Sequence, residues 1–268
     1  MNPDSIAIAL NDADDEPRLA AIARVAENPA GLSDASLDAL LRCLGANRKI
    51  IQRRAAEALA VVAQRDPRIV EKLRNALSGN DSRMRWGVAY ALGLIDDALD
   101  LRAMPVLVEA LASSDGDVRW AAAELVVRLG EKNHDAVGKQ LIALAHDGNL
   151  NARKMALYCL RDVGGPREDV LEAAESCCAE HHGLLKMAAL SLLSRMENAG
   201  ERAAALAIRL LEYDPDEGVR RCAAVALGHI GNRSPRVTEA LACAANAGDD
   251  IYMKRAAQAA LARLGTTT

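Results

Sequence analysis

A basic or amide side chain recurs at intervals of 33 or 34 residues along this chain of 268 residues. The eight positions are Arg18, Gln52, Arg85, Arg119, Arg153, Lys186, Arg220 and Lys254. So regular a period means that one supersecondary unit is repeated, because a succession of unlike elements has no fixed spacing. A repeat array grows in one direction and needs no separate cores, so the period predicts a single domain over residues 1–268.

The clearest copy of the unit, from Asp214 to Gly228, predicts a helix with one apolar face. Asp216 is a suitable N-cap, since its carboxylate can accept bonds from the unpaired amides at a helix start. The apolar residues that follow have helical spacing: Val219, Ala223, Ala226, Leu227 and Ile230. Another amphipathic segment, 199–213, comes before it, and Asp214-Pro215 is a turn between the two. Each unit is therefore predicted to be a helical hairpin, and essentially no sheet is expected.

The other copies keep the cap and a column of small residues. Capping residues stand at Asp14, Asp81, Asp115, Asn149 and Asp250, whereas Arg48 and His182 depart from the pattern. The small column reads Ala21, Ala55, Ala89, Ala122 with Ala123, Ala156, Ala189, Ala223 and Ala257. The chain has no Phe, two Trp and four Tyr, so small aliphatic side chains must fill the core and helices can approach closely.

Two segments, Asp216 to Gly228 and Asp81 to Gly93, share an acid, an apolar-Arg pair, spaced alanines and Leu-Gly, and Asp115 to Leu125 follows the same pattern. In these features the chain resembles HEAT repeats, in particular the Ala-rich phycobilisome-lyase-like (E/Z-type) variety, from about Asp4 to Gly265. The resemblance implies an all-α, right-handed α-solenoid of about eight HEAT-like helical hairpins whose second helices line the concave side. Residues 1–33 and 235–268 are expected to be the capping repeats.

The recurrent basic column is interpreted as a structural ladder between repeats. Each basic group could bond to an acid at a neighbouring turn, and a column present in every copy suits stacking better than a local binding site. The ladder residues are Arg18, Arg85, Arg119, Arg153, Lys186, Arg220 and Lys254.

Columns that vary between copies are the place to look for function. The next column places Trp86 and Trp120 on consecutive second helices, and one helical turn further come Tyr90 and Tyr158. Large amphipathic rings on an exposed face have the composition of a protein-binding hot spot. The predicted partner-binding residues are Trp86, Tyr90, Trp120, Tyr158, Lys154, Glu124, Arg53 and Glu57. The alternative is that each Trp only covers the gap between adjacent second helices.

The charge pattern does not commit the chain to nucleic acid or to an anionic membrane. The net charge is −4, with acids and bases interspersed. The first five residues carry no base, and the apolar run from Ile6 to Leu10 is too short for a signal h-region or a membrane span. A cytoplasmic location is therefore expected. Separately, the protein is expected to be a monomer or a homodimer formed through the C-terminal repeat.

The cysteines and histidines offer a weak case for a metal site. All six cysteines lie in predicted helices, so reduced thiols are expected. If the helix predicted from Arg167 to Ala179 continues, Cys177 and Cys178 pair at i, i+4 with His181 and His182, and His146 could add a third ligand. Only part of a ligand set is visible, so no metal and no cofactor is assigned. Phosphate loops, a nucleophile elbow and a His-Glu-x-x-His motif are not found, which favours a non-catalytic protein.

The preferred function is therefore a HEAT-repeat scaffold or adaptor that binds a partner protein or peptide on its concave face. The first alternative is a bilin lyase or chaperone-like protein acting on a chromophore-bearing partner, which rests on the family resemblance alone. The second is nucleic-acid binding through the basic residues of the variable column, Arg53, Lys154, Arg221 and Arg255, against which the interspersed acids argue.

Overall fold

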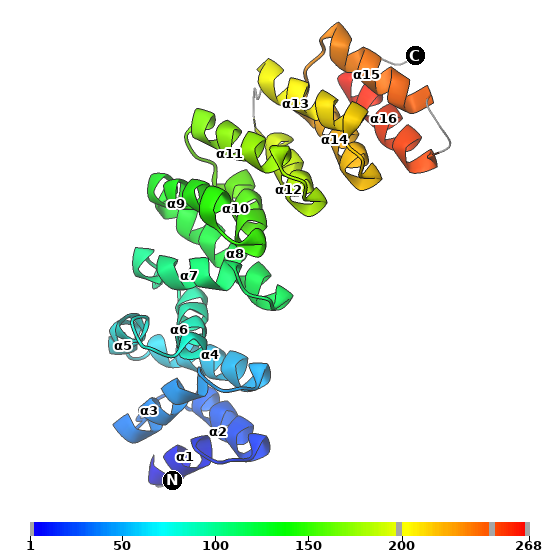
Figure 1. The fold of residues 1–268 in the computed structure, drawn as a ribbon. Helices are drawn as coiled ribbons and strands as arrows, with labels where there is room; N and C mark the ends of the chain where they lie inside the picture. The colour runs from blue at the N-terminus through cyan, green and yellow to red at the C-terminus, as the bar shows by residue number, and fades with distance from the viewer. Residues whose placement is uncertain (1–2, 197–199, 247–249, 266–268) are drawn as a thin grey trace. The chain divides into compact units, whose positions relative to one another are not determined.

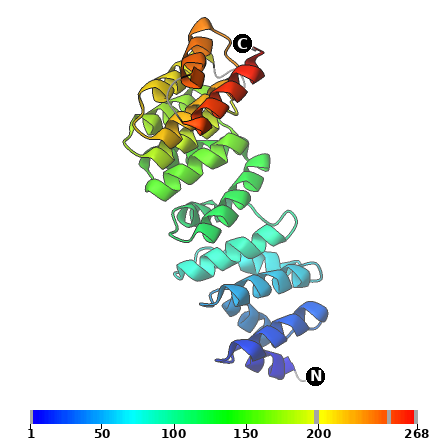
Figure 2. The ribbon, with the colours of Figure 1, turned by 90° about the vertical axis from the view of Figure 1, so that its right-hand side faces the viewer.

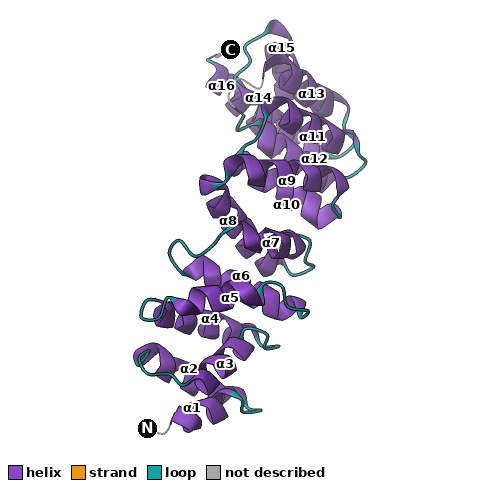
Figure 3. Ribbon diagram, turned by 90° about the vertical axis from the view of Figure 1, so that its left-hand side faces the viewer, coloured by secondary structure: helices purple, strands orange, loops and turns teal. Residues whose placement is uncertain are grey.

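The structure is a computed structural model that describes residues 3–196, 200–246 and 250–265. Over these residues the chain forms sixteen α-helices, one short 3-10 helix and no strand (Figure 3). The helices pair in chain order, which confirms an all-α solenoid of eight helical hairpins. The first helices of the hairpins are α1 (Pro3–Leu10), α3 (Asp34–Cys43), α5 (Arg68–Ala76), α7 (Met104–Leu111), α9 (His134–Asp147), α11 (Arg167–Ala179), α13 (Gly200–Tyr213) and α15 (Pro235–Asn246). The second helices are α2 (Asp15–Glu27), α4 (Lys49–Ala63), α6 (Ser82–Leu94), α8 (Gly116–Lys132), α10 (Leu150–Val163), α12 (Gly183–Leu193), α14 (Glu217–Ile230) and α16 (Ile251–Leu264). The 3-10 helix, η1 (Leu101–Ala103), leads into α7.

Each predicted capping residue directly precedes its helix, and all but one make a side-chain bond there. Side chains accept bonds from first-turn amides at Asp81, Asn149, Asp216 and Asp250, and the Asp115 carboxylate accepts the amide of Asp117. Asp14 precedes α2 but makes no side-chain cap bond, so that prediction is wrong in its chemistry. Two acids in the first turn of α2 supply the negative charge that the helix N-terminus favours.

The small-residue column is buried at every copy, as close packing requires. The Leu-Gly pair at the end of the second helices has the same purpose. A Cβ atom on Gly228 would lie 2.8 Å from the Cα atom of Ala260 on the next second helix. A Cβ atom on Gly93 would clash with a methyl group of Leu125. Glycine therefore leaves room for the backbone of the next second helix at Gly228 and for a leucine side chain at Gly93.

The chain divides into two compact units by its internal contacts. Unit 1 comprises Met1–Ala110 and Trp120–Leu129, and unit 2 comprises Leu111–Arg119 and Gly130–Thr268. Within unit 1 the second helices α2, α4 and α6 pack side by side (Figure 1). Within unit 2 the same holds for α10, α12, α14 and α16, of which α16 is the red helix in Figure 2. The capping roles of residues 1–33 and 235–268 stay predictions.

Candidate protein-interaction surface

Three of the four aromatic side chains expected to bind a partner lie in unit 1. Trp86 and Tyr90 lie one turn apart on α6, both half-buried, with their ring centroids 6.0 Å apart at an interplanar angle of 42°. Trp120 lies on α8 and leaves 57% of its surface exposed. We call these three residues the aromatic patch.

Contacts between α6 and α8 inside unit 1 set the register of the patch. The Arg128 guanidinium donates a 2.6 Å bond to the Gly93 carbonyl, close to where Leu125 packs on Gly93. These contacts join residues 32 to 35 positions apart, which is one repeat. Trp86 and Trp120 therefore occupy corresponding positions on neighbouring helices.

The polar residues predicted around the patch differ in what they do. Arg53 and Glu124 are exposed. Glu57 accepts a 2.9 Å bond from Arg54 on its own helix, so its charge is already partly compensated. An exposed pair of this kind is easily exchanged for a partner's charge, because it contributes only about 0–1 kcal/mol.

The two remaining predicted residues, Lys154 and Tyr158, lie on α10 in unit 2. The Arg161 guanidinium stands 5.9 Å from the centre of the Tyr158 ring, which is a cation-π arrangement. Burial raises the pKa of the Tyr158 hydroxyl. Tyr158 is thus a half-buried ring covered in part by its own helix, unlike the exposed Trp120.

The periodic basic column makes bonds of two kinds. Most members donate to a backbone carbonyl just before their own helix: Gln52 to Leu44, Arg85 to Gly79, Arg119 to Ser113, Arg153 to Ala145 and Arg220 to Asp214. Several also reach the following hairpin, with Arg85 on Glu109, Arg153 on Glu180, Lys186 on Asp214 and Arg18 on the Cys43 thiol. The position six residues before Lys254 lies outside the described residues. Sequence reasoning anticipated acids as partners and missed the carbonyls, although helix C-termini always leave carbonyls to be satisfied.

One member of this column forms a buried ion pair. The Lys186 ammonium lies 2.5 Å from the Asp214 carboxylate, and the two residues are only 9% and 6% exposed. The other carboxylate oxygen accepts the backbone N–H of Asp216 at 3.0 Å. The pair joins α12 to the turn before α14, inside unit 2.

The Cys-His segment does not have the geometry assumed for a metal site. Helix α11 ends at Ala179, and both Glu180 and His182 are extended, so the i, i+4 spacing to the histidines is lost. Cys177 and Cys178 are buried, while His181 and His182 are exposed, as is His146. The Cys177 thiol donates to the Ala145 carbonyl and accepts from Arg153, and burial raises the pKa of Cys178 to about 12. Among the described residues, no three His, Cys, Asp or Glu side chains gather as a metal would require.

All six cysteines are free, and Cys43, Cys159, Cys177 and Cys178 are buried. Cys222 is half-buried and Cys243 is exposed. In the part of the chain that the structure describes, no helix combines the length and apolar character that crossing a bilayer demands.

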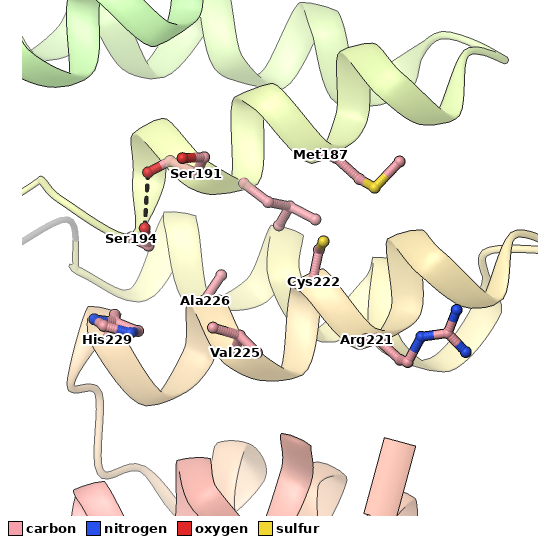
Figure 4. Close-up of a pocket in the computed structure, with 9 residues that line it drawn as sticks. Met187, Ser191, Ser194, Arg221, Cys222, Val225, Ala226 and His229 are labelled. Atoms are coloured by element: carbon pink, nitrogen blue, oxygen red, sulfur yellow. Dashed lines mark hydrogen bonds between the residues drawn. The ribbon is translucent and has the colours of Figure 1, made fainter. Parts of the chain in front are cut away.

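A groove between α12 and α14 was not anticipated from the sequence (Figure 4). Met187 and Leu190 line it from α12, and Cys222 and Val225 line it from α14. Its volume is about 320 Å³. The signal for it lies in the variable columns, where Met187 and Val225 stand at the same positions as the aromatic residues of unit 1.

Comparison with known protein families gives one match, to HEAT repeats, over residues 37–126, 104–194 and 185–262. By sequence, no curated protein matches the chain significantly.

Solved structures with the same fold include Kap121p bound to Nup53p, with a TM-score of 0.63 and 14% identity over 98% of this chain and 33% of that one. Kap95p with RanGDP matches with a TM-score of 0.65 and 14% identity, covering 97% of this chain and 41% of the other. YibA of E. coli matches with a TM-score of 0.56 and 15% identity over 100% of this chain and 93% of YibA. The chain thus spans about a third of Kap121p and nearly the whole of YibA.

Proposed function

The chain belongs to the HEAT-repeat family, and on this basis we propose that it is a non-catalytic scaffold or adaptor. It binds a partner protein or peptide on the face formed by its second helices. The observation that carries the proposal is the aromatic patch, because Trp120 keeps 57% of its surface exposed one repeat along from the packed rings of Trp86 and Tyr90. Covering a large apolar side chain contributes about 1.5–3 kcal/mol, and Trp and Tyr are the commonest hot-spot residues.

Structural neighbours support a role of this type. The Kap121p structures that share the fold include complexes with Nup53p and with Ste12p, and Kap95p was solved with RanGDP. Those proteins hold other proteins, and the likeness of this chain to them is one of fold. Which partner this chain binds depends on its own side chains.

The remaining predicted contacts set polarity and orientation. Arg53, Glu57 and Glu124 do so in unit 1, and Lys154 with Tyr158 does so in unit 2. Exposed charges of both signs favour a partner surface of mixed charge and act chiefly on the association rate. The free thiols fit a reducing compartment such as the cytoplasm.

The test is capture of partners from the native cell by the native chain and by two variants. Trp86→Ala with Trp120→Ala removes the aromatic patch. Tyr213→Ala with Tyr252→Ala is the matched control, since those two rings are 76% and 67% exposed outside the patch. We expect the Trp variant to lose the proteins that both other chains retain, with an unchanged helical circular-dichroism signal. Equal capture by all three chains would refute the proposal, and a lost helical signal would show that the tryptophans are packing residues instead.

The other functions have separate tests. Similarity to the phycobilisome-lyase-like variety of HEAT repeat predicts an absorbance change when a linear tetrapyrrole is added. Nucleic-acid binding predicts a steep loss of affinity with salt in a gel-shift assay. Against it stand Glu57 and Glu124, acids in the variable column next to that of Arg53 and Lys154. A homodimer formed through the C-terminal repeat predicts a doubled mass by light scattering.

A further inference from the structure

A second periodic basic column lies near the C-terminal ends of the second helices in unit 2. Its members are Arg161, Arg195, His229 and Arg263, each 34 residues from the next. Corresponding positions in the four earlier hairpins hold Glu27, Val61, Leu94 and Arg128, of which only Arg128 is basic. Arg128 bonds the Gly93 carbonyl of the preceding repeat, but three hairpins have no base here, so stacking does not require one at this position. A column that is basic only from α8 onward is the kind that a local binding site produces.

The second helices of unit 2 carry most of its positive charge. Helices α10, α12, α14 and α16 contain nine Lys and Arg side chains against two acids: Arg153, Lys154, Arg161, Lys186, Arg220, Arg221, Lys254, Arg255 and Arg263 against Asp162 and Glu217. The first helices show the reverse, with nine acids against five bases. The acids are Asp135, Asp147, Glu168, Asp169, Glu172, Glu175, Glu201, Glu212 and Glu239, and the bases are Lys139, Arg167, Arg202, Arg209 and Arg236. One layer of helices is therefore basic in a chain whose net charge is −4.

The groove between α12 and α14 lies between Arg221 and the second basic column. On α14, Arg221 and His229 stand at opposite ends of the groove, and the eight helical steps from one to the other correspond to about 12 Å. Between these ends the lining is apolar, and Val225 is 47% exposed. Figure 4 shows Met187 and Cys222 facing each other across the groove, with His229 beyond Val225 and Ala226. The volume of about 320 Å³ lies at the lower end of the range of ligand pockets and has room for one apolar side chain of a bound segment.

The C-terminal end of the groove is rich in cations. Both ring nitrogens of His229 lie within 2.6 Å of an Arg263 guanidinium nitrogen. Burial, Arg263 and Arg195 all lower the pKa of His229, so the imidazole is neutral near pH 7 and the arginines carry the charge. On α10, which packs against α12, Arg161 donates to the Ser191 hydroxyl at 3.5 Å and is paired with Asp162.

We propose that unit 2 binds an acidic peptide segment of the partner, with an aliphatic side chain of that segment seated in the groove between α12 and α14. This inference rests on the proposed scaffold function and names the chemistry of the partner. Arg221 at one end of the apolar strip and the second basic column at the other complement carboxylates that flank an apolar side chain. Single-stranded nucleic acid fits less well, because the groove lining has no Trp, Tyr or Phe ring on which a base could stack.

The test measures the anisotropy of a fluorescein-labelled peptide with one central leucine between runs of glutamate, added to the full chain. Replacing the leucine by alanine should weaken binding at least about tenfold, as loss of a buried aliphatic side chain predicts. The same peptide with lysine runs, and a thymidine oligonucleotide, should bind more weakly still. Absent binding of the glutamate–leucine peptide, equal binding of the alanine peptide, or tighter binding of the oligonucleotide would overturn the proposal.

Variants of the full chain locate the site. Val225→Asp and the double substitution Arg161→Ala with Arg263→Ala should each weaken the glutamate–leucine peptide at least about tenfold. Leu184→Asp and Lys139→Ala are the matched controls, because both residues are exposed and lie outside the groove lining. We expect the controls to bind like the native chain. Equal weakening by a control and its matched variant would overturn the placement.

Two cysteines provide an independent readout. Iodoacetamide labelling with and without the peptide should show Cys222 protected, since it lines the groove, and exposed Cys243 unchanged. Unprotected Cys222 at a saturating peptide concentration would refute the seating of the side chain. Failure of this proposal leaves the Trp-dependent capture intact, whereas failure of the aromatic patch leaves peptide binding intact, so the two are distinguishable.

Discussion

Removing Lys186 from its buried pair with Asp214 tests the structural interpretation of the periodic basic column. The ammonium and carboxylate are 2.5 Å apart, with side chains 11% and 2% exposed. Lys186→Met leaves the Asp214 carboxylate buried without its counter-ion, and breaking a buried pair in this way costs about 3–5 kcal/mol. The measurement is urea unfolding of the full chain, followed by helical circular dichroism at neutral pH.

Two further variants make the result interpretable. Lys72→Met breaks an exposed pair, in which Lys72 and Asp38 lie 3.8 Å apart and are 46% and 55% exposed, and should cost about 0–1 kcal/mol. Adding Asp214→Asn to Lys186→Met removes the uncompensated charge and keeps an oxygen for the Asp216 amide, so it should recover much of the loss. If Lys186→Met costs no more than Lys72→Met, the reasoning about this column is refuted.

Three smaller perturbations address packing, capping and pH. Gly228→Val forces a side chain against the backbone of Ala260, which a Cβ atom would approach to 2.8 Å. Thermal melting should therefore show a loss of stability of about 1–3 kcal/mol. An unchanged melting temperature would contradict the close approach. Asp216→Ala should lower the free energy of unfolding in urea by about 1 kcal/mol and Asp14→Ala by almost nothing, because of these two residues only Asp216 makes side-chain cap bonds. Equal losses would contradict the assignment. The pKa of His229 is lowered from 6.5 in the folded chain, so its contribution to stability is full above pH 6.5 and is lost as the pH falls from 6.5 towards the folded pKa. His229→Gln should therefore make the melting temperature depend less on pH between about pH 7.5 and about pH 5. An unaltered pH dependence would contradict this role of His229.

The hairpin architecture could be predicted because stacking imposes the same demands on every copy. Each second helix needs a small residue where it meets its neighbour and a cap where it begins, and both leave marks at the 34-residue period. Local geometry is harder to infer, because it depends on neighbours that a single copy does not show. Asp14 has the right residue type but makes no cap bond, and α11 ends at Ala179 before His181, which removes the metal-binding spacing.

The candidate surface was partly predictable for the same reason. The period supplies the register that places Trp86 and Trp120 at corresponding positions, so the aromatic patch follows from the sequence. The groove does not, because Met187 and Val225 are ordinary helix residues and the open space between them depends on how closely α12 and α14 pack. The division into two units is also hidden, since the period continues through it unchanged.

The two basic columns of unit 2 differ in what is left for a partner to bind. In the first, the Arg153 and Lys186 side chains are 14% and 11% exposed and their donors are used on carbonyls, carboxylates and a thiol of the chain itself. A partner's carboxylate could take these donors only by leaving buried acceptors unpaired, which costs about 1–3 kcal/mol for each group. In the second column Arg161 is 32% exposed and its bond to an adjacent carboxylate is a surface pair, which is exchanged at little cost. Positive charge on the second helices is therefore available to a partner only where stacking has not already used it, and that restricts recognition to the C-terminal column and the groove beside it.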